Sequence, residues 1–350
     1  NGAFRVAQRG TSFTGLGDAS ANPYTMDRWF FAEESDGGGR YTVAQESGAG
    51  PGNGFTNQLS VHCTTADGTL AAGILNLLEQ RIEAKELQHI MKGTAAAKAL
   101  TMSFWVKSSQ TGVMNVLIRA QDTDRSILTN YTINVADTWE YKSFTIPGDT
   151  TGTITNDTGI GFMVYFVLAA GSTFQGGTAD AWATHNNNRY GTDQTVNIFA
   201  STDDDWSVTG VQLEVGSVAT DFEHEDFGVT YLKCKRYLPF YFDAANNSNF
   251  RFAFGAAYST SYFQCILPFL VPPRAAVTIS VDSIGNWRAE TGDGTGITVT
   301  AIATQPSVNA DNFGMWSTAN FQSSSGYTAK EPGFLRPNGT SGIMIASCEL

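Results

Sequence analysis

The sequence predicts an all-β protein, and three observations lead to that prediction. Short runs of Val, Ile, Thr, Phe and Tyr recur along the chain between clusters of Gly and Asn, a pattern typical of strands joined by turns. Only 15% of the residues are charged whereas 12% are aromatic, which favours packed strands over a solvated chain. The longest apolar run, residues 159–170, is much shorter than the roughly 20 residues of a membrane-spanning helix. We therefore expect strands throughout and no membrane insertion.

Length and charge distribution predict two domains. A chain of 350 residues is long enough for one core, but two domains are the better expectation. The net charge is −12, yet the part from Gly228 onward holds eight Lys and Arg against seven Asp and Glu. We therefore predict a jelly-roll-like β-sandwich in residues 1–227 and a second, smaller β-sandwich in residues 228–350. The acidic balance also argues against nucleic-acid binding, which needs a basic surface.

Alternation of polar and apolar residues places the strands of the first domain. The first strand is expected at residues 3–8. Residues 29–31 and 40–45 are expected to form the next strand pair, joined by a tight turn at 36–39. The other strands are predicted at 57–63, 100–108, 113–121, 129–134, 140–146, 161–168 and 208–215.

Two segments of the first domain depart from this simple pattern. Residues 73–91 become helical in composition toward their end, so we predict a strand over 73–83 and a short helix over 84–91. Residues 171–196 form a long stretch without regular alternation. Loops of that length inside a compact domain are usually functional or disordered. This loop is therefore the first place to look for a binding site.

The second domain is predicted to hold fewer strands. Residues 231–242 and 250–258 are expected to be neighbouring strands. A double proline at 272–273 must precede the strand that follows it, because proline cannot donate a hydrogen bond to a sheet. The later strands are expected at 297–303, 326–331 and 342–348.

The cysteines and histidines predict neither a disulfide framework nor a zinc site. The four cysteines are Cys63, Cys234, Cys265 and Cys348, and none of them form a C-x-x-C pair. We expect them to be reduced and mostly buried. The four histidines are His62, His89, His185 and His224, at spacings that do not match a zinc site.

Known catalytic motifs are missing from the sequence, so we predict no catalytic residue and no enzyme activity. It contains no G-x-S-x-G, no H-E-x-x-H and no phosphate-binding glycine loop. Glu33 and Glu34 could supply a carboxylate pair, but neighbours on a strand point to opposite faces. The acidic run 203–205 could bind a hard cation, although a solvated turn is the favoured interpretation. Calcium is thus the one cofactor kept open, and otherwise we expect none.

Two stretches far apart in the chain resemble a known family. The first is NGAFRVAQRGTSF with YTMDRW, in residues 1–29, and the second is GVQLEVGSVATDFE followed by CKRYL, in residues 210–238. Together they resemble a module in the distal tail-fibre proteins of tailed bacteriophages. The chain also ends in ASCEL, similar to the end of that family. The resemblance covers nearly the whole chain, and we expect the chain to be the C-terminal part of a longer protein.

This resemblance implies a structural role in a virion. The expected function is attachment of a phage tail fibre to host surface glycan, with a homotrimer, host polysaccharide and other virion tail proteins as partners. The rival class is an enzyme, a tailspike that degrades polysaccharide as a glycoside hydrolase or lyase. Such enzymes usually carry long β-helix repeats, and this sequence shows no internal repeat of 20–50 residues. A capsid or head fibre built with the same module is a third possibility.

The tryptophans suggest where a glycan would bind. Trp105 and Trp139 lie in predicted strands and are expected in the core. Trp182 lies in the 171–196 loop among amide and basic side chains, an arrangement typical of sugar recognition. The predicted glycan-binding residues are Trp182, His185, Asn187, Arg189 and Tyr190. The competing interpretation is that Trp182 packs the loop against the sandwich or against a neighbouring subunit.

The second domain offers an alternative glycan site and a surface for association. Trp287 and Arg288 lie in a turn-rich stretch, and Trp316 lies among other aromatics. These three are the alternative glycan-binding residues. The sequence FRFAF, residues 250–254, is predicted to present its three phenylalanines on one face, and such an apolar patch is expected to support a trimer.

Overall fold

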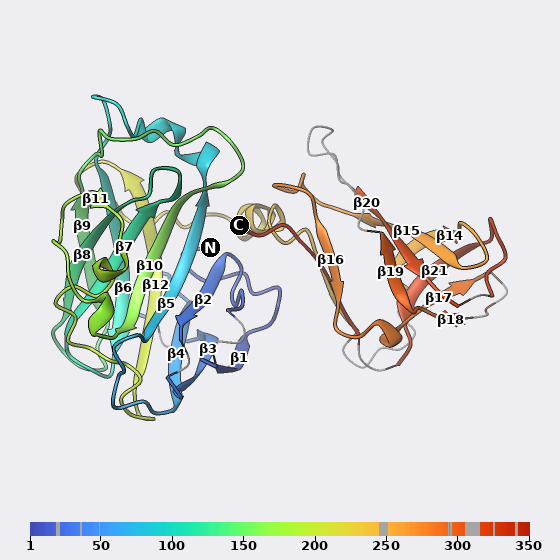
Figure 1. Cartoon of the computed structure of the whole chain (residues 1–350), viewed down its shortest axis with the longest axis horizontal. Coiled ribbons are helices and arrows are strands. Elements are labelled where there is room, and N and C mark those ends of the chain that lie inside the picture. The colour runs from blue at the N-terminus through green and yellow to red at the C-terminus, as the bar shows by residue number, and fades with distance from the viewer. Residues whose placement is uncertain are drawn as a thin grey trace. The chain divides into compact units, whose positions relative to one another are not determined.

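The chain divides into two compact units. The computed structural model describes residues 1–18, 22–35, 37–48, 50–244, 251–292, 294, 296–304, 316–324, 326–339 and 342–350. By their contacts, residues 1–230 with Leu350 form the first unit and residues 231–349 form the second (Figure 1). This division lies close to the change in charge at Gly228.

The first unit is a sandwich of two six-stranded antiparallel sheets. Sheet A has the order β1-β3-β4-β12-β6-β9, and sheet B has the order β11-β8-β7-β10-β5-β2. The strands of sheet A are β1 (Ser12–Leu16), β3 (Arg40–Ser47), β4 (Asn57–Thr65), β6 (Leu100–Ser108), β9 (Glu140–Ile146) and β12 (Asp205–Val215). Those of sheet B are β2 (Trp29–Glu34), β5 (Leu75–Glu83), β7 (Gly112–Ala120), β8 (Arg125–Ile133), β10 (Ile160–Ala170) and β11 (Ala183–Thr184). The chain crosses repeatedly between the sheets, so the predicted jelly-roll-like sandwich is confirmed.

Aromatic side chains fill the space between the two sheets. The ring of Phe166 in β10 lies 5.0 Å from that of Phe104 in β6, 5.4 Å from Trp206 in β12 and 6.1 Å from Trp29 in β2, between ring centroids. All four side chains are fully buried. Alternation along each strand turns one set of side chains into this core and the other set outward, to the faces of the sandwich.

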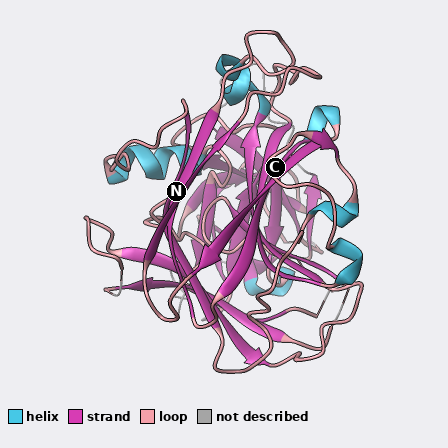
Figure 2. Ribbon diagram, turned by 90° about the vertical axis from the view of Figure 1, so that its left-hand side faces the viewer, coloured by secondary structure: helices cyan, strands magenta, loops and turns pink. Residues whose placement is uncertain are grey.

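Several strands begin and end where the sequence predicts. Strands β6 and β9 match the predicted ranges, and residues 75–90 form strand β5 followed by the 3-10 helix η1 (Ala84–Ile90). Helix η1 ends at Met91, whose φ of 57° stops the helix. The other 3-10 helices are short: η2 (Gln121–Thr123), η3 (Ser172–Phe174), η4 (Asn187–Arg189) and η5 (Ile284–Asn286). Figure 2 shows strands making up most of the fold.

Two predictions near the N-terminus are wrong. Residues 3–8 form an irregular segment, although Phe4 and Val6 are buried as their apolar character requires. Strands β2 and β3 do not pair, since β2 bonds to β5 in sheet B and β3 bonds to β1 and β4 in sheet A. A local pattern shows that a segment is a strand, but it does not show which sheet the strand joins.

The second unit is a smaller β-sandwich. Sheet C has the order β13-β22-β16, and sheet D has the order β18-β17-β21-β14-β15-β20-β19. Their strands are β13 (Phe240–Asp243), β14 (Ala253–Ala257), β15 (Tyr262–Pro268), β16 (Thr278–Val281), β17 (Trp287–Thr291), β18 (Gly296–Thr298), β19 (Ala301–Thr304), β20 (Trp316–Gln322), β21 (Pro332–Pro337) and β22 (Ile343–Ser347). Buried side chains of both sheets, among them Ile279 of sheet C and Phe263 of sheet D, share one core.

Three predictions for the second domain need correction. Helix α1 (Phe227–Lys235) replaces the first part of the strand predicted over 231–242. Strand β13 pairs with β22, whereas β14 pairs with β15 and β21, so the two predicted neighbours lie in different sheets. The predicted strand at 326–331 is irregular and turn structure, and β21 begins after it.

The cysteines are buried and free, as expected. Among the described residues, the structure contains no helix that is both long and apolar enough to cross a membrane.

Candidate functional site

The outer face of sheet A carries an open cleft. In β6, Leu100, Met102, Phe104 and Val106 point into the core. The residues between them, Thr101, Ser103, Trp105 and Lys107, therefore point outward. The same alternation turns Tyr141 and Ser143 of β9 outward, because they pair with Trp105 and Ser103 across the two strands. We call the outward side chains of sheet A the polar face.

A cleft of about 870 Å³ lies on this face. Its floor includes Ser103, Trp105, Tyr141 and Ser143, and residues 218–222 with His224 form one wall. That wall is held by Glu214, whose carboxylate accepts hydrogen bonds from the backbone N–H and hydroxyl of Thr220 at 2.9 and 2.7 Å. A concave site with aromatic and hydroxyl side chains is the common form of a small-molecule or oligomer site.

Trp105 and Tyr141 form an aromatic pair at the floor of the cleft. Their ring centroids are 5.4 Å apart, and Tyr141 is 45% exposed. Placing Trp105 in the core was therefore wrong, because its neighbours Phe104 and Val106 already occupy the inward positions of β6. Trp139 is also only half-buried, and the ammonium of Lys107 lies 5.9 Å from its ring centroid. Aromatic rings on an outward face can stack against an apolar surface of a ligand.

A second aromatic group also lines the cleft. The ring centroids of Phe55, Phe222 and His224 lie 5.0 Å from one another, and Nε2 of His224 is 3.1 Å from the carbonyl of Asn53. Phe55 lies over Gly210 of β12, which has a φ of 63° at a register shift in the strand. A Cβ atom there would lie 2.6 Å from the Phe55 ring. Only glycine therefore allows this close packing.

Beside the cleft, the polar face carries a hydrogen-bonded network. The Glu46 carboxylate lies 2.9 Å from Nε2 of His62 and accepts hydrogen bonds from Ser60 at 2.8 Å and Gln58 at 3.1 Å. Burial raises the pKa of Glu46, but the bonds from Ser60 and His62 outweigh it and hold the pKa below its usual value. Glu46 is thus an ionised group that is already engaged within the sheet.

Asp205 in β12 pairs with His62 in the neighbouring strand β4, on the same face of the sheet. Burial raises the pKa of its carboxyl, although Lys107 and His62 oppose this effect. The side chains of its two acidic neighbours point to different surroundings. Asp203 is exposed, and the Asp204 carboxylate accepts hydrogen bonds from Ser109 and Gln110. Among the described residues, no group of three or more His, Cys, Asp or Glu is arranged to hold a metal ion.

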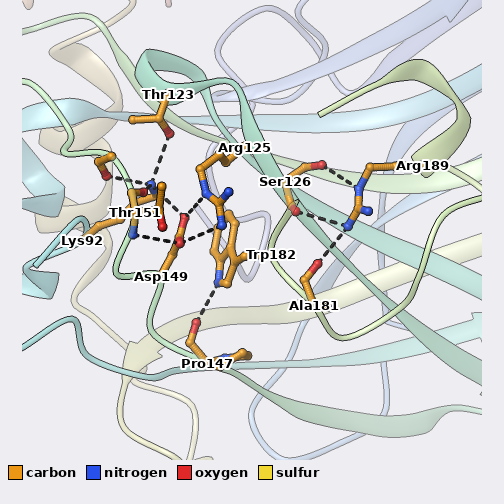
Figure 3. A network of polar contacts seen from close by, with 11 residues as sticks. Lys92, Thr123, Arg125, Ser126, Pro147, Asp149, Thr151, Ala181, Trp182 and Arg189 are labelled. Carbon is orange, nitrogen blue, oxygen red and sulfur yellow. Dashed lines mark hydrogen bonds and ion pairs between the residues drawn. The ribbon is translucent and has the colours of Figure 1, made fainter. Parts of the chain in front are cut away.

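Several of the predicted side chains in the loop at 171–196 are packed against the sandwich. Trp182 donates a hydrogen bond from Nε1 to the carbonyl of Pro147 at 2.7 Å, and its ring packs near Phe162 (Figure 3). Arg189 is buried and donates to the hydroxyl of Ser126 at 3.2 Å and to the carbonyl of Ala181 at 2.9 Å. These contacts correspond to the competing interpretation, in which Trp182 packs the loop against the sandwich.

The other predicted loop residues are divided between interior and surface. His185 is buried against Ser126, and burial together with Arg119 lowers the pKa of its imidazole to about 4. Tyr190 is buried and packs edge-on against Tyr165. Asn187 is exposed. Because three of the five predicted side chains are buried, the structure does not bring the set together on one surface.

Figure 3 shows a buried charge cluster next to Trp182. Nζ of Lys92 lies 2.8 Å from the Thr151 carbonyl, 2.9 Å from the Gly152 carbonyl, 3.2 Å from the Thr123 hydroxyl and 3.0 Å from the Asp149 carboxylate. Arg125 donates two further bonds to Asp149, at 2.8 and 3.0 Å. The side chains of Lys92 and Asp149 are 2% and 3% exposed. The cluster therefore joins several loops at the edge of the sandwich and is closed to solvent.

The alternative site in the second unit is also not formed as predicted. Trp287 is fully buried in the core, because alternation in β17 turns it inward, and Arg288 donates to the carbonyl of Gly296 at 2.7 Å. Trp316 begins β20, and its side chain lies outside the described part of the chain. The predicted row of three phenylalanines is broken as well: Phe252 stacks inward on Phe242, Phe254 is 58% exposed, and Phe250 lies outside the described residues.

The second unit instead carries a smaller cleft of about 250 Å³. Phe254 and Phe334 line it, with ring centroids 5.6 Å apart. Arg251 and Glu290, which also line it, form an ion pair. This cleft lies on the outer face of sheet D.

One signal in the sequence would have identified the cleft on the first unit. In LTMSFWVKS the inward positions are apolar, and the outward ones are polar except for Trp105. A large aromatic residue in a row of polar side chains is the unusual feature of this strand. Its register, rather than its composition, marks Trp105 as a surface residue.

Comparisons with known proteins give only distant structural similarities. No family model matches the sequence, and no curated protein matches it. Among solved structures, the chain is similar to the enzymatically active domain of bacteriophage CBA120 tailspike protein 4, with 12% identity and a TM-score of 0.31, covering 58% of this chain. The match spans 21% of that tailspike.

Two carbohydrate-binding modules are similar at the same level. A family 4 module shares 15% identity, with a TM-score of 0.30 and coverage of 62% of this chain and 98% of the module. The family 11 module of a cellulosomal cellulase of Clostridium thermocellum shares 12% identity, with a TM-score of 0.30 and coverage of 59% and 96%. Similarities of this size do not carry a conclusion about function, which depends here on the residues of the cleft.

Proposed function

We propose that the first unit binds a polysaccharide in the cleft on the polar face. The observation that carries this proposal is the Trp105–Tyr141 pair at the floor of the cleft, next to the Ser103–Ser143 pair on the same two strands. An aromatic ring stacks on the apolar face of a sugar ring, while hydroxyl groups bond to the hydroxyls of the sugar.

Binding without cleavage is the form of the proposal that the polar face supports. Glu46 is bonded to three side chains of its own sheet, so its carboxylate is occupied in the structure. A glycoside hydrolase needs two carboxyl groups facing each other across the sugar, one of them free to protonate the leaving oxygen. The rival activity, degradation of the polysaccharide, is tested by assaying bound glycan for the release of new reducing ends. Release by the wild-type protein would establish the enzyme instead.

The binding site itself is tested by Trp105→Ala. We expect this variant to lose about 2 kcal/mol of binding free energy, roughly thirtyfold in affinity for host surface polysaccharide, because it loses the stacking ring. Affinity electrophoresis in polysaccharide-containing gels measures the change. Tyr258→Ala is the matched control, since it removes an exposed aromatic side chain from the second unit and should bind normally. If Trp182→Ala abolishes binding in a folded protein and Trp105→Ala does not, the loop site predicted from the sequence is right.

We further propose that the chain is the distal part of a phage tail fibre and attaches the virion to its host. Support comes from the paired motifs at residues 1–29 and 210–238, which resemble that family. Other virion tail proteins would then be its partners. A head fibre with the same module is the alternative, and labelling of intact virions with an antibody against the chain distinguishes the two.

A homotrimer is proposed for the assembled fibre. The second unit exposes Phe254, Ile266 and Phe334 on sheet D, and exposed apolar patches usually mark interfaces. We expect light scattering at micromolar concentration to give three times the mass of the 37.6 kDa chain. Phe254→Ser with Phe334→Ser should weaken the association, whereas Val135→Ser, at an exposed position of the first unit, should not. A monomeric mass for the unaltered chain would contradict the proposal.

A further inference from the structure

The charges around the cleft restrict the chemical class of its ligand. Among the described residues that line the cleft there is no Lys or Arg, and the titratable side chains on its walls are the exposed Asp221 and His224, together with the phenol of Tyr141. Glu214, bonded to Thr220 of the wall, adds a second carboxylate next to the cleft. A carboxylate or phosphate on the ligand would therefore meet acidic side chains and find no Lys or Arg among the described lining residues to pair with.

Three cations close in sequence or contact to residues of the cleft are engaged elsewhere, and one of them, Lys142, pairs with Glu140. Lys107 is two residues from Trp105 on the same face, but its ammonium lies over the Trp139 ring and acts on Asp205. Arg5 donates to the carbonyl of Glu225 at 2.9 Å, and its guanidinium lies 5.6 Å from the ring of Phe227. All three cations thus have partners outside the cleft, and moving them toward a ligand would break these contacts.

The first unit as a whole is also negatively charged. Residues 1–227 contain 26 Asp and Glu against 13 Lys and Arg. An acidic surface of this kind slows the approach of a polyanion and raises the local concentration of cations instead. At long range as well as in the cleft, an acidic polysaccharide is disfavoured.

We infer that the cleft is selective for neutral polysaccharide and excludes glycans that carry carboxylate or phosphate groups. The inference rests on the proposed binding function and adds the ligand class to it. The contacts available are a stacking surface from Trp105 and Tyr141 and hydroxyls from Ser103 and Ser143. These groups recognise uncharged sugar rings and their hydroxyls, so binding should depend little on salt.

Matched pairs of polysaccharides test the inference. The probes are dextran, mannan, galactan and mixed-linkage glucan, each with its carboxymethylated derivative, and retention is measured by affinity electrophoresis with the full chain. We expect at least one neutral polymer to retain the protein and its carboxymethylated form to bind at least about tenfold more weakly. Retention by the neutral polymer should be unchanged up to about 0.5 M salt. Equal retention by both members of a pair overturns the inference and leaves the binding function standing. Failure of the whole panel to retain the protein overturns both.

A gain of function provides the second arm. Ser143 is exposed on β9 at the floor of the cleft, so Ser143→Arg places a guanidinium there without disturbing the core. We expect the variant to bind the carboxymethylated polymer about tenfold more tightly than the wild type does, through charge-assisted hydrogen bonds. Ser143→Gln is the control for side-chain length and should show no such gain. If Ser143→Gln gains as much as Ser143→Arg, charge is not what excludes the acidic polymer.

Discussion

Asp149→Ala is expected to lower the free energy of unfolding of the first unit by about 3–5 kcal/mol. The Asp149 carboxylate is the shared partner of two cations, Lys92 at 3.0 Å and Arg125 at 2.8 and 3.0 Å, and is itself buried. Its removal leaves Lys92 buried without the opposite charge, which is far more damaging than losing an exposed ion pair. Urea denaturation of the full chain, followed by tryptophan fluorescence, measures the change.

Asp124→Ala is the matched control. Asp124 pairs with Arg119 at 2.7 Å, but its side chain is 56% exposed, so its loss should change the free energy of unfolding by no more than about 1 kcal/mol.

The dependence of stability on pH provides a further check on the role of Asp149. Burial raises the pKa of Asp149, but the bonds from Arg125 and Lys92 outweigh it and lower the pKa. The stabilisation by Asp149 is therefore complete above its unfolded pKa of about 4 and declines as the pH falls through its folded pKa. If Asp149→Ala left the free energy of unfolding unchanged, the charge cluster would not be important for the stability of the first unit.

Phe104→Ala is expected to lower the free energy of unfolding by about 3–5 kcal/mol as well. Phe104 is fully buried, with ring centroids 5.0 Å from Phe166, 5.2 Å from Tyr131 and 6.2 Å from Phe144. Truncation loses the transfer free energy of the ring and leaves a cavity that the surrounding sheets cannot fill. The same urea experiment measures the effect.

The neighbouring residue gives the sharpest comparison. Trp105→Ala, one position further along β6, should change the free energy of unfolding by about 1 kcal/mol or less, because its side chain lies on the outer face. The two variants together test the register of β6. If Trp105→Ala were the more destabilising of the two, Trp105 would belong to the core and the cleft would lose its stacking surface.

The sequence predicted many strands well because their patterns are local. Residues 100–108 alternate except at Trp105 and form β6 over the same range, and residues 140–146 form β9. The pairing of strands was less predictable. Residues 29–31 and 40–45 are close in sequence, yet β2 and β3 lie in opposite sheets, because the order of strands in a jelly roll depends on contacts between distant segments.

The candidate site was predicted less well than the fold. The 171–196 loop resembled a binding loop because it is rich in amide, basic and aromatic residues, but composition does not show which side chains find partners inside the protein. Ser126 of β8 and the carbonyl of Ala181 accept hydrogen bonds from Arg189. Neither residue belongs to the stretch 182–190, whose polar and aromatic side chains suggested a site. Helix α1 was missed for a related reason, since its aromatic and aliphatic residues also suit a strand.

The covalent attachment of the Lys92 ammonium to the chain affects how the stability of the first unit depends on the surrounding solution. Four oxygen atoms from two separate segments, Thr123 and residues 149–152, converge on this one nitrogen. A free ion in such a place would leave whenever its concentration outside the protein fell. The ammonium is attached to the chain, so its effective concentration at these oxygens is fixed by the length of its own side chain and does not depend on dilution. The joined loops should therefore hold equally well in chelating buffer and in mineral-poor water.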